Sequence, residues 1–273
     1  MYKLIAIDLD GTLLNSKKHI SQEDKDAIRF AIAQGVKIVI CSGRIFAGVK
    51  IFARQLEIKG PIIACNGALI SDAETGDILY SNPLKVEDCI RVIELCREEG
   101  IYFHVYAGET MLAEKLEFSS LFYQKRNEFL PEEERIKIRI VDNVGQVLRA
   151  ETDLPYKLVA ISEEQRVLRN LRSKVQKISG VEVVSSNYDN FEVMNSGVNK
   201  GAALKFISEI LGIKREETIA IGDNENDDSM IRFAGLGVAM GNAEDSIKRI
   251  SQYVTKANEE CGVAEVIRKY IKL

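Results

Sequence analysis

Apolar runs alternate with amphipathic segments along the first part of the chain. Residues 2–7 and 36–41 are almost uninterrupted apolar runs, as expected for strands that are buried on both faces of a parallel sheet. Between them, Ser21 and Asp24 form a capping-box pattern that predicts the start of a helix, and Gly35 suits its end. Because a strand, a helix and a strand in this order form a right-handed βαβ unit, the two strands are predicted to be parallel neighbours.

A different pattern occupies the middle of the chain. After Pro83 the predicted order is helix, strand, strand, repeated around a charged stretch at 132–150 for which no elements are predicted. This order is typical of an antiparallel-rich α+β module. Its predicted helices lie at 86–99, 117–129 and 163–178, and its predicted strands at 101–107, 110–114, 157–161 and 181–185. A further strand is predicted at 191–194. We therefore expect an α/β fold with a doubly wound, mostly parallel sheet built from 1–83 and 191–273, and an α+β domain inserted at 84–190.

Two carboxylates follow directly on the first predicted strand. Asp8 and Asp10 are two positions apart, and residues with this spacing in an extended segment point to the same side, so both carboxylates share one small volume. Two such anions need a cation or a proton between them. Gly11 permits an immediate turn, and Thr12 offers a hydroxyl to brace it. A calcium loop also begins Asp-x-Asp, but its glycine is sixth and it lies between helices; here the glycine is fourth and a strand precedes it.

Further polar residues follow or open other predicted elements. Ser42, Gly43 and Arg44 come after the second strand, where a glycine lets backbone amides approach an anion. Lys200 opens a predicted helix, and Asp223 begins an acidic loop after another apolar run. Taken singly, these features are ordinary turn and helix-start chemistry. Because ligand sites in open α/β sheets form at the carboxyl ends of the strands, we expect them to converge on one phosphate site that contains a metal and a nucleophile.

This combination resembles the haloacid dehalogenase superfamily, and within it the Cof-type phosphatases with a type IIB cap. The resemblance covers the whole chain and rests on five motifs in the expected order, which are Asp8-Leu-Asp-Gly-Thr, Ser42-Gly-Arg, Cys65-Asn-Gly-Ala, Gly197-Val-Asn-Lys-Gly and Gly222-Asp-Asn-x-Asn-Asp. It implies a Rossmann-like core, an inserted cap, and phosphatase chemistry through an aspartyl-phosphate.

The resemblance also implies roles for single residues. Asp8 would attack phosphorus in line, and Asp10 would protonate the leaving oxygen and later deprotonate water. Mg²⁺ would be held by Asp8, by Asp223 and by the backbone carbonyl of Asp10. The phosphoryl oxygens would be bound by Ser42, Lys200, Asn226 and the backbone amides of Leu9 and Gly43, with Thr12, Arg44, Asn66 and Asp227 in support.

Composition argues against several other functions. The net charge of -4 and the pI near 5.5 do not suit nucleic-acid binding as a main role. No apolar stretch approaches the roughly 20 residues of a membrane span, and the chain enters its first strand at once, without a signal peptide. We therefore expect a cytoplasmic monomer or weak homodimer. Five cysteines without a Cys-x-x-Cys pattern, and only two histidines, argue against a disulfide framework, a zinc site or a catalytic triad.

The expected substrate is a small phosphorylated metabolite, with sugar phosphates first. The predicted strand 101–107 carries Tyr102, His104 and Tyr106 on one face, and these side chains suit a sugar or aromatic leaving group; the alternative is that this face is exposed or lies under the unassigned stretch. Two other functions remain open. A sugar phosphomutase would need a bisphosphate activator, and a non-catalytic phosphometabolite-binding protein would gain nothing from crowding Asp10 beside Asp8.

Overall fold

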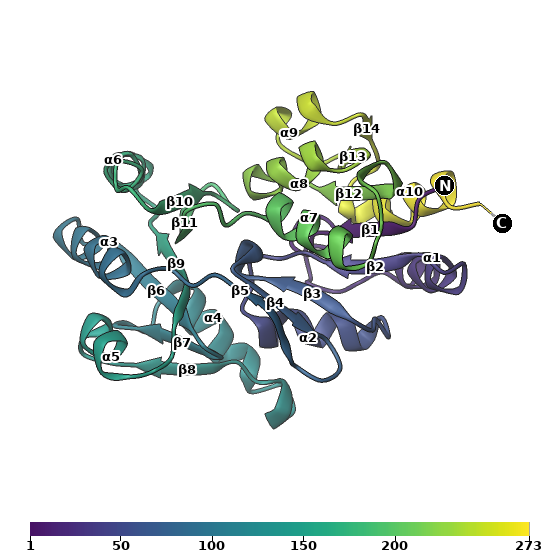
Figure 1. Ribbon diagram of the computed structural model, residues 1–273. Coiled ribbons are helices and arrows are strands. Elements are labelled where there is room, and N and C mark those ends of the chain that lie inside the picture. Colours follow the sequence, from purple (N-terminus) through teal and green to yellow (C-terminus); the bar gives the residue numbers. More distant parts are fainter. Residues whose placement is uncertain (273) are drawn as a thin grey trace.

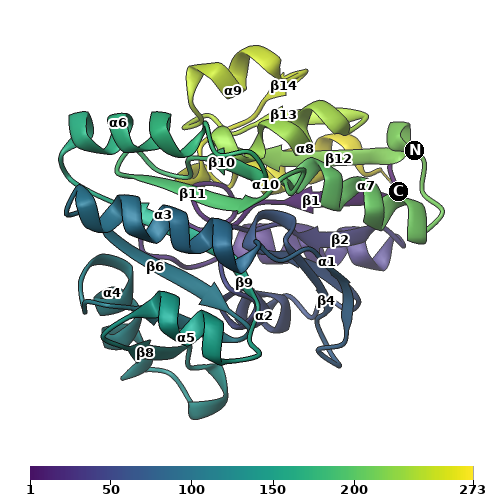
Figure 2. The ribbon, with the colours of Figure 1, turned by 60° about the vertical axis from the view of Figure 1, so that its left-hand side comes forward.

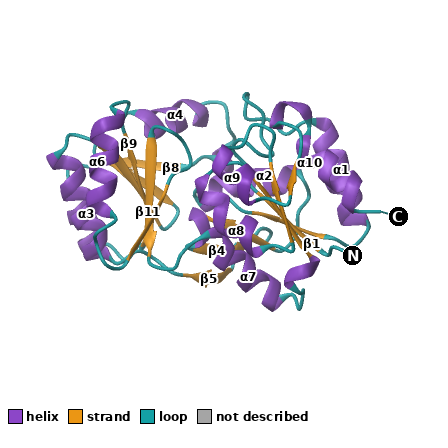
Figure 3. Ribbon diagram, turned by 90° about the horizontal axis from the view of Figure 1, so that it is seen from above, coloured by secondary structure: helices purple, strands orange, loops and turns teal. Residues whose placement is uncertain are grey.

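The computed structural model describes residues 1–272, which form two lobes side by side (Figure 1, Figure 3). We call them the core lobe, built on a five-stranded sheet, and the cap lobe, built on a six-stranded sheet. The N-terminus lies at the end of the core lobe that is far from the cap lobe (Figure 1). No helix within residues 1–272 has the length and the apolar character needed to cross a membrane.

The core lobe contains a parallel sheet in the order β14-β13-β12-β1-β2. Its strands are β1 (Leu4–Ile7), β2 (Lys37–Ile40), β12 (Thr218–Gly222), β13 (Leu236–Ala239) and β14 (Tyr253–Val254). Beside β2 lies a small antiparallel sheet of β3 (Pro61–Ala64), β4 (Leu69–Asp72) and β5 (Ile78–Ser81). The predicted parallel pairing of the first two strands is confirmed, with Leu4 opposite Lys37 and Ile7 opposite Ile40.

Helices cover both faces of the core sheet, because alternate residues of β1 point to opposite sides. Leu4 and Ala6 pack in the cluster that contains buried residues of α7 and α8, while Ile5 and Ile7 pack with α1 and α10. The helices of the core lobe are α1 (Gln22–Ala33), α2 (Phe46–Gln55), α7 (Lys200–Ile210), α8 (Asp228–Phe233), α9 (Asp245–Ile250) and α10 (Gly262–Tyr270). The predicted doubly wound α/β fold is therefore confirmed.

The cap lobe contains a sheet in the order β10-β11-β9-β6-β7-β8, antiparallel except for the β7–β8 pair. Its strands are β6 (Tyr102–Ala107), β7 (Thr110–Ala113), β8 (Lys137–Ile140), β9 (Pro155–Ile161), β10 (Val181–Val184) and β11 (Asn190–Asn195). Its helices are α3 (Val86–Glu98), α4 (Phe118–Asn127), α5 (Val144–Ala150) and α6 (Gln165–Val175). Figure 2 shows α3, α5 and α6 along one face of this sheet.

The charged stretch without predicted elements forms β8 and α5. The division of the chain into 1–83, 84–190 and 191–273 stays a prediction. Strand β11 lies across the second boundary, because its pairing with β9 and β10 places Asn190–Asn195 in the cap sheet.

Buried aromatic and sulfur-containing side chains hold the two lobes together. Tyr106, Tyr123 and Met194 of the cap lobe belong to the same buried cluster as Phe46 and Phe52 of the core lobe. Burial of apolar surface across this contact favours the closed arrangement of the lobes. The two lobes are therefore joined by apolar packing as well as by the chain connections between them.

Candidate active site

Three neighbouring strands of the core sheet end at one edge, and a polar residue follows each of them. Asp8 follows β1, Ser42 lies just beyond β2, and Asp223 follows β12. Since β1 lies between the other two strands, Asp8 takes the central position. Its backbone N–H donates to the Ile221 carbonyl at 3.1 Å, so the strand pairing continues up to the carboxylate.

The ammonium of Lys200 lies between two carboxylates. Lys200 is the first residue of α7, whose N-cap Asn199 accepts a hydrogen bond from the backbone of Ala202. The Lys200 side chain is 0% exposed, and its Nζ lies 2.6 Å from Asp8 Oδ1 and 2.6 Å from Asp227 Oδ1. Burial opposes the charge, but the two carboxylates raise the pKa of Lys200 well above its usual value. This lysine is a fixed cation beside Asp8.

Both oxygens of Asp227 have partners within the protein. Its Oδ1 contacts Lys200, and its Oδ2 accepts the backbone N–H groups of Asp223 at 2.9 Å and Asn224 at 3.1 Å. The side chain thus fixes both the lysine and the loop after β12. These contacts support a role for Asp227 in orienting Lys200.

Asp223 lies close against the turn that follows β1. The Thr12 hydroxyl donates to its Oδ1 at 2.7 Å. Gly11 has a φ of +84°, and a Cβ atom at this position would lie 2.2 Å from Asp223 Oδ2. Position 11 therefore needs glycine both for its backbone conformation and for the space that the carboxylate takes.

The buried carboxylates provide the donor set of a hard divalent cation. Oxygen atoms of Asp8, Asp223 and Asp227 all lie within 4.8 Å of one another, and carboxylate oxygens are the protein ligands that Mg²⁺ prefers. Burial raises the pKa of Asp8 well above its usual value, although Lys200 opposes this, and burial together with Asp227 raises the pKa of Asp223 to about 7. A bound cation would relieve this accumulation of negative charge.

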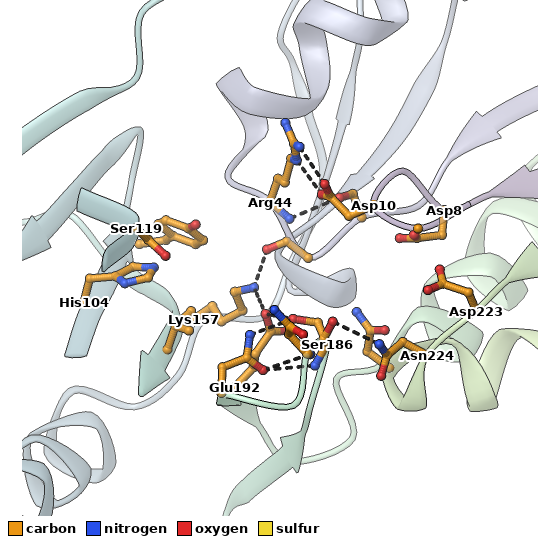
Figure 4. A pocket seen from close by; sticks show the side chains of 18 of the residues that line it. Asp8, Asp10, Arg44, His104, Ser119, Lys157, Ser186, Glu192, Asp223 and Asn224 are labelled. Atoms are coloured by element: carbon orange, nitrogen blue, oxygen red, sulfur yellow. Dashed lines mark hydrogen bonds and ion pairs between the residues drawn. The ribbon is translucent and has the colours of Figure 1, made fainter. Parts of the chain in front are cut away.

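The Asp10 carboxylate is turned toward a different set of partners. The Arg44 guanidinium donates to both of its oxygens, at 2.7 and 2.8 Å (Figure 4). Lys18 Nζ lies 2.7 Å from Asp10 Oδ1. Although burial acts in the opposite direction, Arg44 and Lys18 hold the pKa of Asp10 well below its usual range. The intervening Leu9 is buried in the core. Asp8 and Asp10 therefore share one turn but have opposite electrostatic surroundings.

The loops after β2 and β3 support each other beside this turn. The Ser42 hydroxyl accepts the N–H of Arg44 at 3.2 Å, and the Ser42 carbonyl accepts the N–H of Asn66 at 3.0 Å. Asn66 has left-handed backbone angles, with a φ of +56°, and its Oδ1 accepts from Asn226 Nδ2 at 3.3 Å. A Cβ at Gly43 would lie 2.9 Å from Asn66 Oδ1, so this glycine permits the close approach.

A family model for the haloacid dehalogenase-like hydrolases matches residues 5–267. The chain belongs to this family. Phosphatase YwpJ of Bacillus subtilis is 32% identical, and the match covers 97% of this chain and 99% of that protein. A haloacid dehalogenase-like hydrolase structure from B. subtilis has a TM-score of 0.89 and 32% identity, covering 98% of this chain and 100% of that one. The predicted family, a Cof-type phosphatase with a type IIB cap, and the predicted class, a hydrolase of phosphoric monoesters, are confirmed.

Other relatives carry more specific names. A B. subtilis protein named 5-amino-6-(5-phospho-D-ribitylamino)uracil phosphatase is 34% identical over 97% of this chain and 96% of its own length. The pyridoxal phosphate phosphatase YbhA of Escherichia coli is 29% identical, with 98% of both chains covered. A subclass IIB sugar phosphatase has a TM-score of 0.81 at 24% identity, covers 98% of both chains, and shows similarity of fold alone.

A buried ion pair from the cap lobe contacts the loops after β2 and β3. Lys157 of β9 and Glu192 of β11 are 2% and 5% exposed, and their charged groups lie 2.8 Å apart. Lys157 also donates to the Gly43 carbonyl, and Glu192 accepts from Asn66 and, at 2.8 Å, from Ser186. Sequence analysis missed both charged residues. The available signal was a single charged side chain in the interior of an otherwise uncharged strand.

A cavity of about 360 Å³ lies between the two lobes. Figure 4 shows the aspartates on one side of it, His104 and Ser119 on the other, and Lys157 between them. Of the three cap residues predicted to contact a leaving group, His104 and Tyr106 line the cavity. Tyr102 lies under α4, where its hydroxyl oxygen accepts the N–H of Ser120 at 3.2 Å. All three are buried, so the face is not exposed to solvent.

We expect the charge of Glu192 to be needed for folding stability. Glu192→Gln keeps the shape of the side chain but leaves the Lys157 ammonium buried without a counter-charge, and breaking a buried pair in this way costs about 3–5 kcal/mol. Denaturant unfolding would measure the loss. Glu87→Gln, which breaks the exposed pair with Arg149, is the matched control and should leave unfolding unchanged. Equal stability of the two variants would contradict the prediction.

We also expect the metal-free protein to lose stability as the pH rises. The carboxyl of Asp223, with a folded pKa of about 7 and an unfolded value near 3.9, holds its proton more tightly when folded. Its contribution is therefore complete below about pH 4 and is lost as the pH rises to about 7. The free energies of unfolding of wild type and Asp223→Asn would be measured in EDTA across this range. As the pH rises, the wild type should lose stability relative to the variant. A difference independent of pH would contradict the raised pKa.

Proposed function

We propose that this hydrolase is a Mg²⁺-dependent phosphatase of small phosphomonoesters, with sugar phosphates as the leading substrates, and that it forms an aspartyl-phosphate on Asp8. The observation that carries the proposal is the group of Asp8, Lys200 and Asp223 beside a cavity that the cap lobe covers. Lys200 Nζ lies 2.6 Å from Asp8 Oδ1, so a phosphoryl group approaching Asp8 would also approach a fixed cation. Positioning and charge stabilisation of this kind supply most of the catalysis of phosphoryl transfer.

The reaction has two halves. In the first, an Asp8 oxygen attacks phosphorus, the bond from phosphorus to the ester oxygen breaks, and Asp10 gives its proton to that departing oxygen. The alcohol leaves, and the phosphoryl group remains on Asp8. In the second half, water attacks the same phosphorus and gives a proton to Asp10, the bond from phosphorus to the Asp8 oxygen breaks, and inorganic phosphate leaves. Asp8 and Asp10 return to their starting forms, and one ester has been hydrolysed.

The contacts that Asp10 makes in this structure suit its role in the second half of the reaction, where it accepts a proton from water. Its pairing with Arg44 and Lys18 favours the ionised carboxylate, which is the form that accepts a proton from water. Donation to the leaving oxygen requires the protonated form, so the side chain has to leave this pair in the first half. The Asp10 side chain is 39% exposed, which leaves it room to turn.

Groups of the core lobe would bind the phosphoryl oxygens. The Ser42 hydroxyl, the Lys200 ammonium, the Asn226 amide and the backbone amides of Leu9 and Gly43 form the proposed set. Mg²⁺ would be held by Asp8, Asp223 and the backbone carbonyl of Asp10, and when bound would offset the negative charge of the phosphoryl oxygens. The assignment is supported by the carboxylate oxygens of Asp8 and Asp223, which lie within 4.8 Å of each other at one edge of the core sheet.

The lining of the cavity supports a polar leaving group. Its cap side presents Ser119, Ser186, Asn187 and Asn190 together with Tyr106, a combination of hydrogen-bonding groups and an aromatic wall that suits a sugar. The relatives named for a ribitylamino-uracil phosphate and for pyridoxal phosphate extend the candidates to esters with a ring. Phosphate release from a panel of sugar, alditol and pyridoxal phosphates tests the proposal, and a requirement for a bisphosphate activator would indicate a mutase instead.

Replacing the nucleophile should abolish turnover. Asp8→Asn keeps the size of the side chain but removes the attacking carboxylate and one metal ligand, so kcat should fall by at least about 10³-fold. The variant should fold, because Asp227 still pairs with the Lys200 ammonium and one anion fewer relieves the repulsion among the buried carboxylates. Near-normal phosphate release by folded Asp8→Asn protein would contradict the mechanism. Asp10→Asn is the matched variant: with p-nitrophenyl phosphate, whose leaving group needs no proton, it should release a single burst of nitrophenol and then stall.

Activity should depend on Mg²⁺. EDTA should abolish phosphate release and Mg²⁺ should restore it, whereas Ca²⁺ should inhibit, because its larger and looser coordination misplaces the attacking carboxylate. A thermal shift gives an independent measurement: Mg²⁺ should raise the Tm of wild type and have a smaller effect on Asp223→Asn. Full activity of the chelated protein would contradict the assignment of Asp223.

A further inference from the structure

Nearly every backbone polar group of the Ser42–Arg44 loop, which follows β2, is paired within the protein. The Ser42 N–H, the Ser42 carbonyl and the Arg44 carbonyl bond to β3 and the turn after it, at 2.9 to 3.0 Å. The Arg44 N–H donates to the Ser42 hydroxyl oxygen at 3.2 Å. Within residues 1–272, the Gly43 N–H and the Ser42 O–H donate to no protein group. These two are among the donors proposed to bind the phosphoryl oxygens.

The remaining backbone group of this loop, the Gly43 carbonyl, is held by the cap lobe. It accepts from the ammonium of Lys157, and no other residue of the described chain donates to it. A Cβ atom at Gly43 would lie 3.0 Å from Lys157 Nζ and 3.2 Å from Glu192 Oε2, so glycine leaves room for the ion pair. Figure 4 shows the lysine side chain between Glu192 and the part of the core lobe that carries Arg44. The pair therefore lies directly against the loop.

The contact with Lys157 fixes one peptide unit. The Gly43 carbonyl and the Arg44 N–H belong to the same planar peptide group, with Lys157 on its oxygen and the Ser42 hydroxyl on its hydrogen. Glycine gives the backbone before this peptide unusual freedom to turn, and turning it would take the N–H away from Ser42. While the N–H occupies the hydroxyl oxygen, the hydroxyl hydrogen is left for another acceptor.

Lys157 is itself held in place on several sides. Its side chain is 2% exposed, and its Nζ lies 2.8 Å from Glu192 Oε1 and 5.3 Å from the centre of the Tyr106 ring. An aromatic face at this distance attracts a cation. Although burial acts in the opposite direction, Lys157 with Asn66 and Ser186 holds the pKa of Glu192 below its usual value. The pair is therefore ionic, and the ammonium stays on the Gly43 carbonyl.

Glu192 extends the same support to the next loop. An ionised carboxylate only accepts hydrogen bonds, so it selects the orientation of the Asn66 amide in which Nδ2 faces Glu192. The Asn66 Oδ1 atom then faces Asn226 and accepts from its Nδ2 at 3.3 Å. Asn226 is a further proposed phosphate ligand, so the two members of the ion pair each lead to phosphate-binding donors of the core lobe.

We propose that Lys157 is a positioning residue of the phosphoryl-transfer reaction and acts from the cap lobe without touching the substrate. By holding the Gly43 carbonyl, it fixes the peptide that orients the Ser42 hydroxyl, so that the Ser42 O–H and the Gly43 N–H stay available to the phosphoryl group. Glu192 holds Lys157 and orients Asn226 through Asn66. The inference rests on the proposed function, since it assigns the support of the same phosphate-binding donors.

The test removes the ammonium without leaving a buried charge unpaired. Lys157→Met/Glu192→Gln replaces both members with uncharged side chains of similar volume, a change that is often neutral for folding. Lys174→Met/Glu99→Gln does the same to an ion pair at the surface of the cap lobe and is the matched control. Values of kcat/KM per folded molecule would be measured with Mg²⁺ for p-nitrophenyl phosphate, acetyl phosphate and glucose 6-phosphate. Inorganic phosphate would be titrated as a competitive inhibitor.

For Lys157→Met/Glu192→Gln we expect kcat/KM to fall by about 10- to 100-fold on all three substrates, the usual effect of misplacing groups that bind the reacting centre. The inhibition constant of inorganic phosphate should rise by about 3- to 10-fold, because its hydrogen bonds are no longer directed. The effect of Mg²⁺ on the Tm should be unchanged, since the pair makes no hydrogen bond to Asp8, Asp10 or Asp223. The surface-pair control should behave as wild type.

A double-mutant cycle tests the route through Ser42. In a Ser42→Ala background there is no hydroxyl to orient, so the same pair of substitutions should cost at least about threefold less than in wild type. Glu192→Gln alone gives a second comparison, because it keeps the ammonium beside Gly43. It should be less stable than the double variant and yet more active per folded molecule, whereas a role in folding alone would make activity follow stability.

Several results would overturn the inference. A loss on glucose 6-phosphate alone assigns Lys157 to the leaving group, and an undiminished loss in the Ser42→Ala background assigns it to direct contact with the phosphoryl group. Unchanged kinetics of the double variant, or activities that follow stability, remove the positioning role. If the double variant does not fold, Glu192→Gln is compared in the two backgrounds, and its loss has to shrink without the Ser42 hydroxyl. These results leave the wild-type reaction intact, whereas a wild type that cannot hydrolyse p-nitrophenyl phosphate with Mg²⁺ contradicts the proposed function itself.

Discussion

The ammonium of Lys200 has no access to solvent, and the candidate active site is arranged around it. A buried cation is tolerated only where anions are held against it, because removing it from water is costly. Asp8 and Asp227 each lie 2.6 Å from the ammonium, and Asp227 uses its other oxygen to fix the loop after β12. One charge therefore joins the ends of β1 and β12 to the start of α7, across a sequence separation of 192 residues between Asp8 and Lys200.

A second buried lysine plays the corresponding part for the cap lobe. Lys157 belongs to the cap sheet, but its ammonium donates to the carbonyl of Gly43 in the core, while its partner Glu192 accepts from Asn66. The loops proposed to bind phosphate thus continue from the core strands on one side and are contacted by the cap lobe on the other. Any movement of the cap lobe away from the core has to break the Lys157–Gly43 contact. Such a movement would remove one of the contacts of the loop that carries Ser42 and Gly43.

Sequence analysis predicted the parts of the structure that local chemistry determines. The alternation of buried strands with capped helices gave the parallel core, and strand ends rich in aspartate, glycine and serine gave the residues around Asp8. Two kinds of feature escaped it because they depend on contacts between distant segments. The parallel pairing of β8 with β7 follows from tertiary packing, since the residues of β8 are mostly exposed and highly charged. The role of Lys157 becomes visible only when Glu192 lies beside it.

The two aspartates at the end of β1 also show why a phosphorylated substrate and a metal suit this site together. In the structure as described, burial favours the protonated form of Asp8, and Arg44 with Lys18 favours the ionised form of Asp10. A nucleophile and a general acid need the reverse of both. A divalent cation beside Asp8 and Asp223 would favour their ionised forms. A phosphoryl dianion entering the cavity would compete with Asp10 for Arg44 and Lys18, and a carboxylate that loses such partners regains a proton more easily. The cation would thus favour the ionised Asp8 that attacks, and the phosphoryl group would favour the protonated Asp10 that donates. Asp8 and Asp10 would both be in their reactive forms only when the metal and the substrate are bound together.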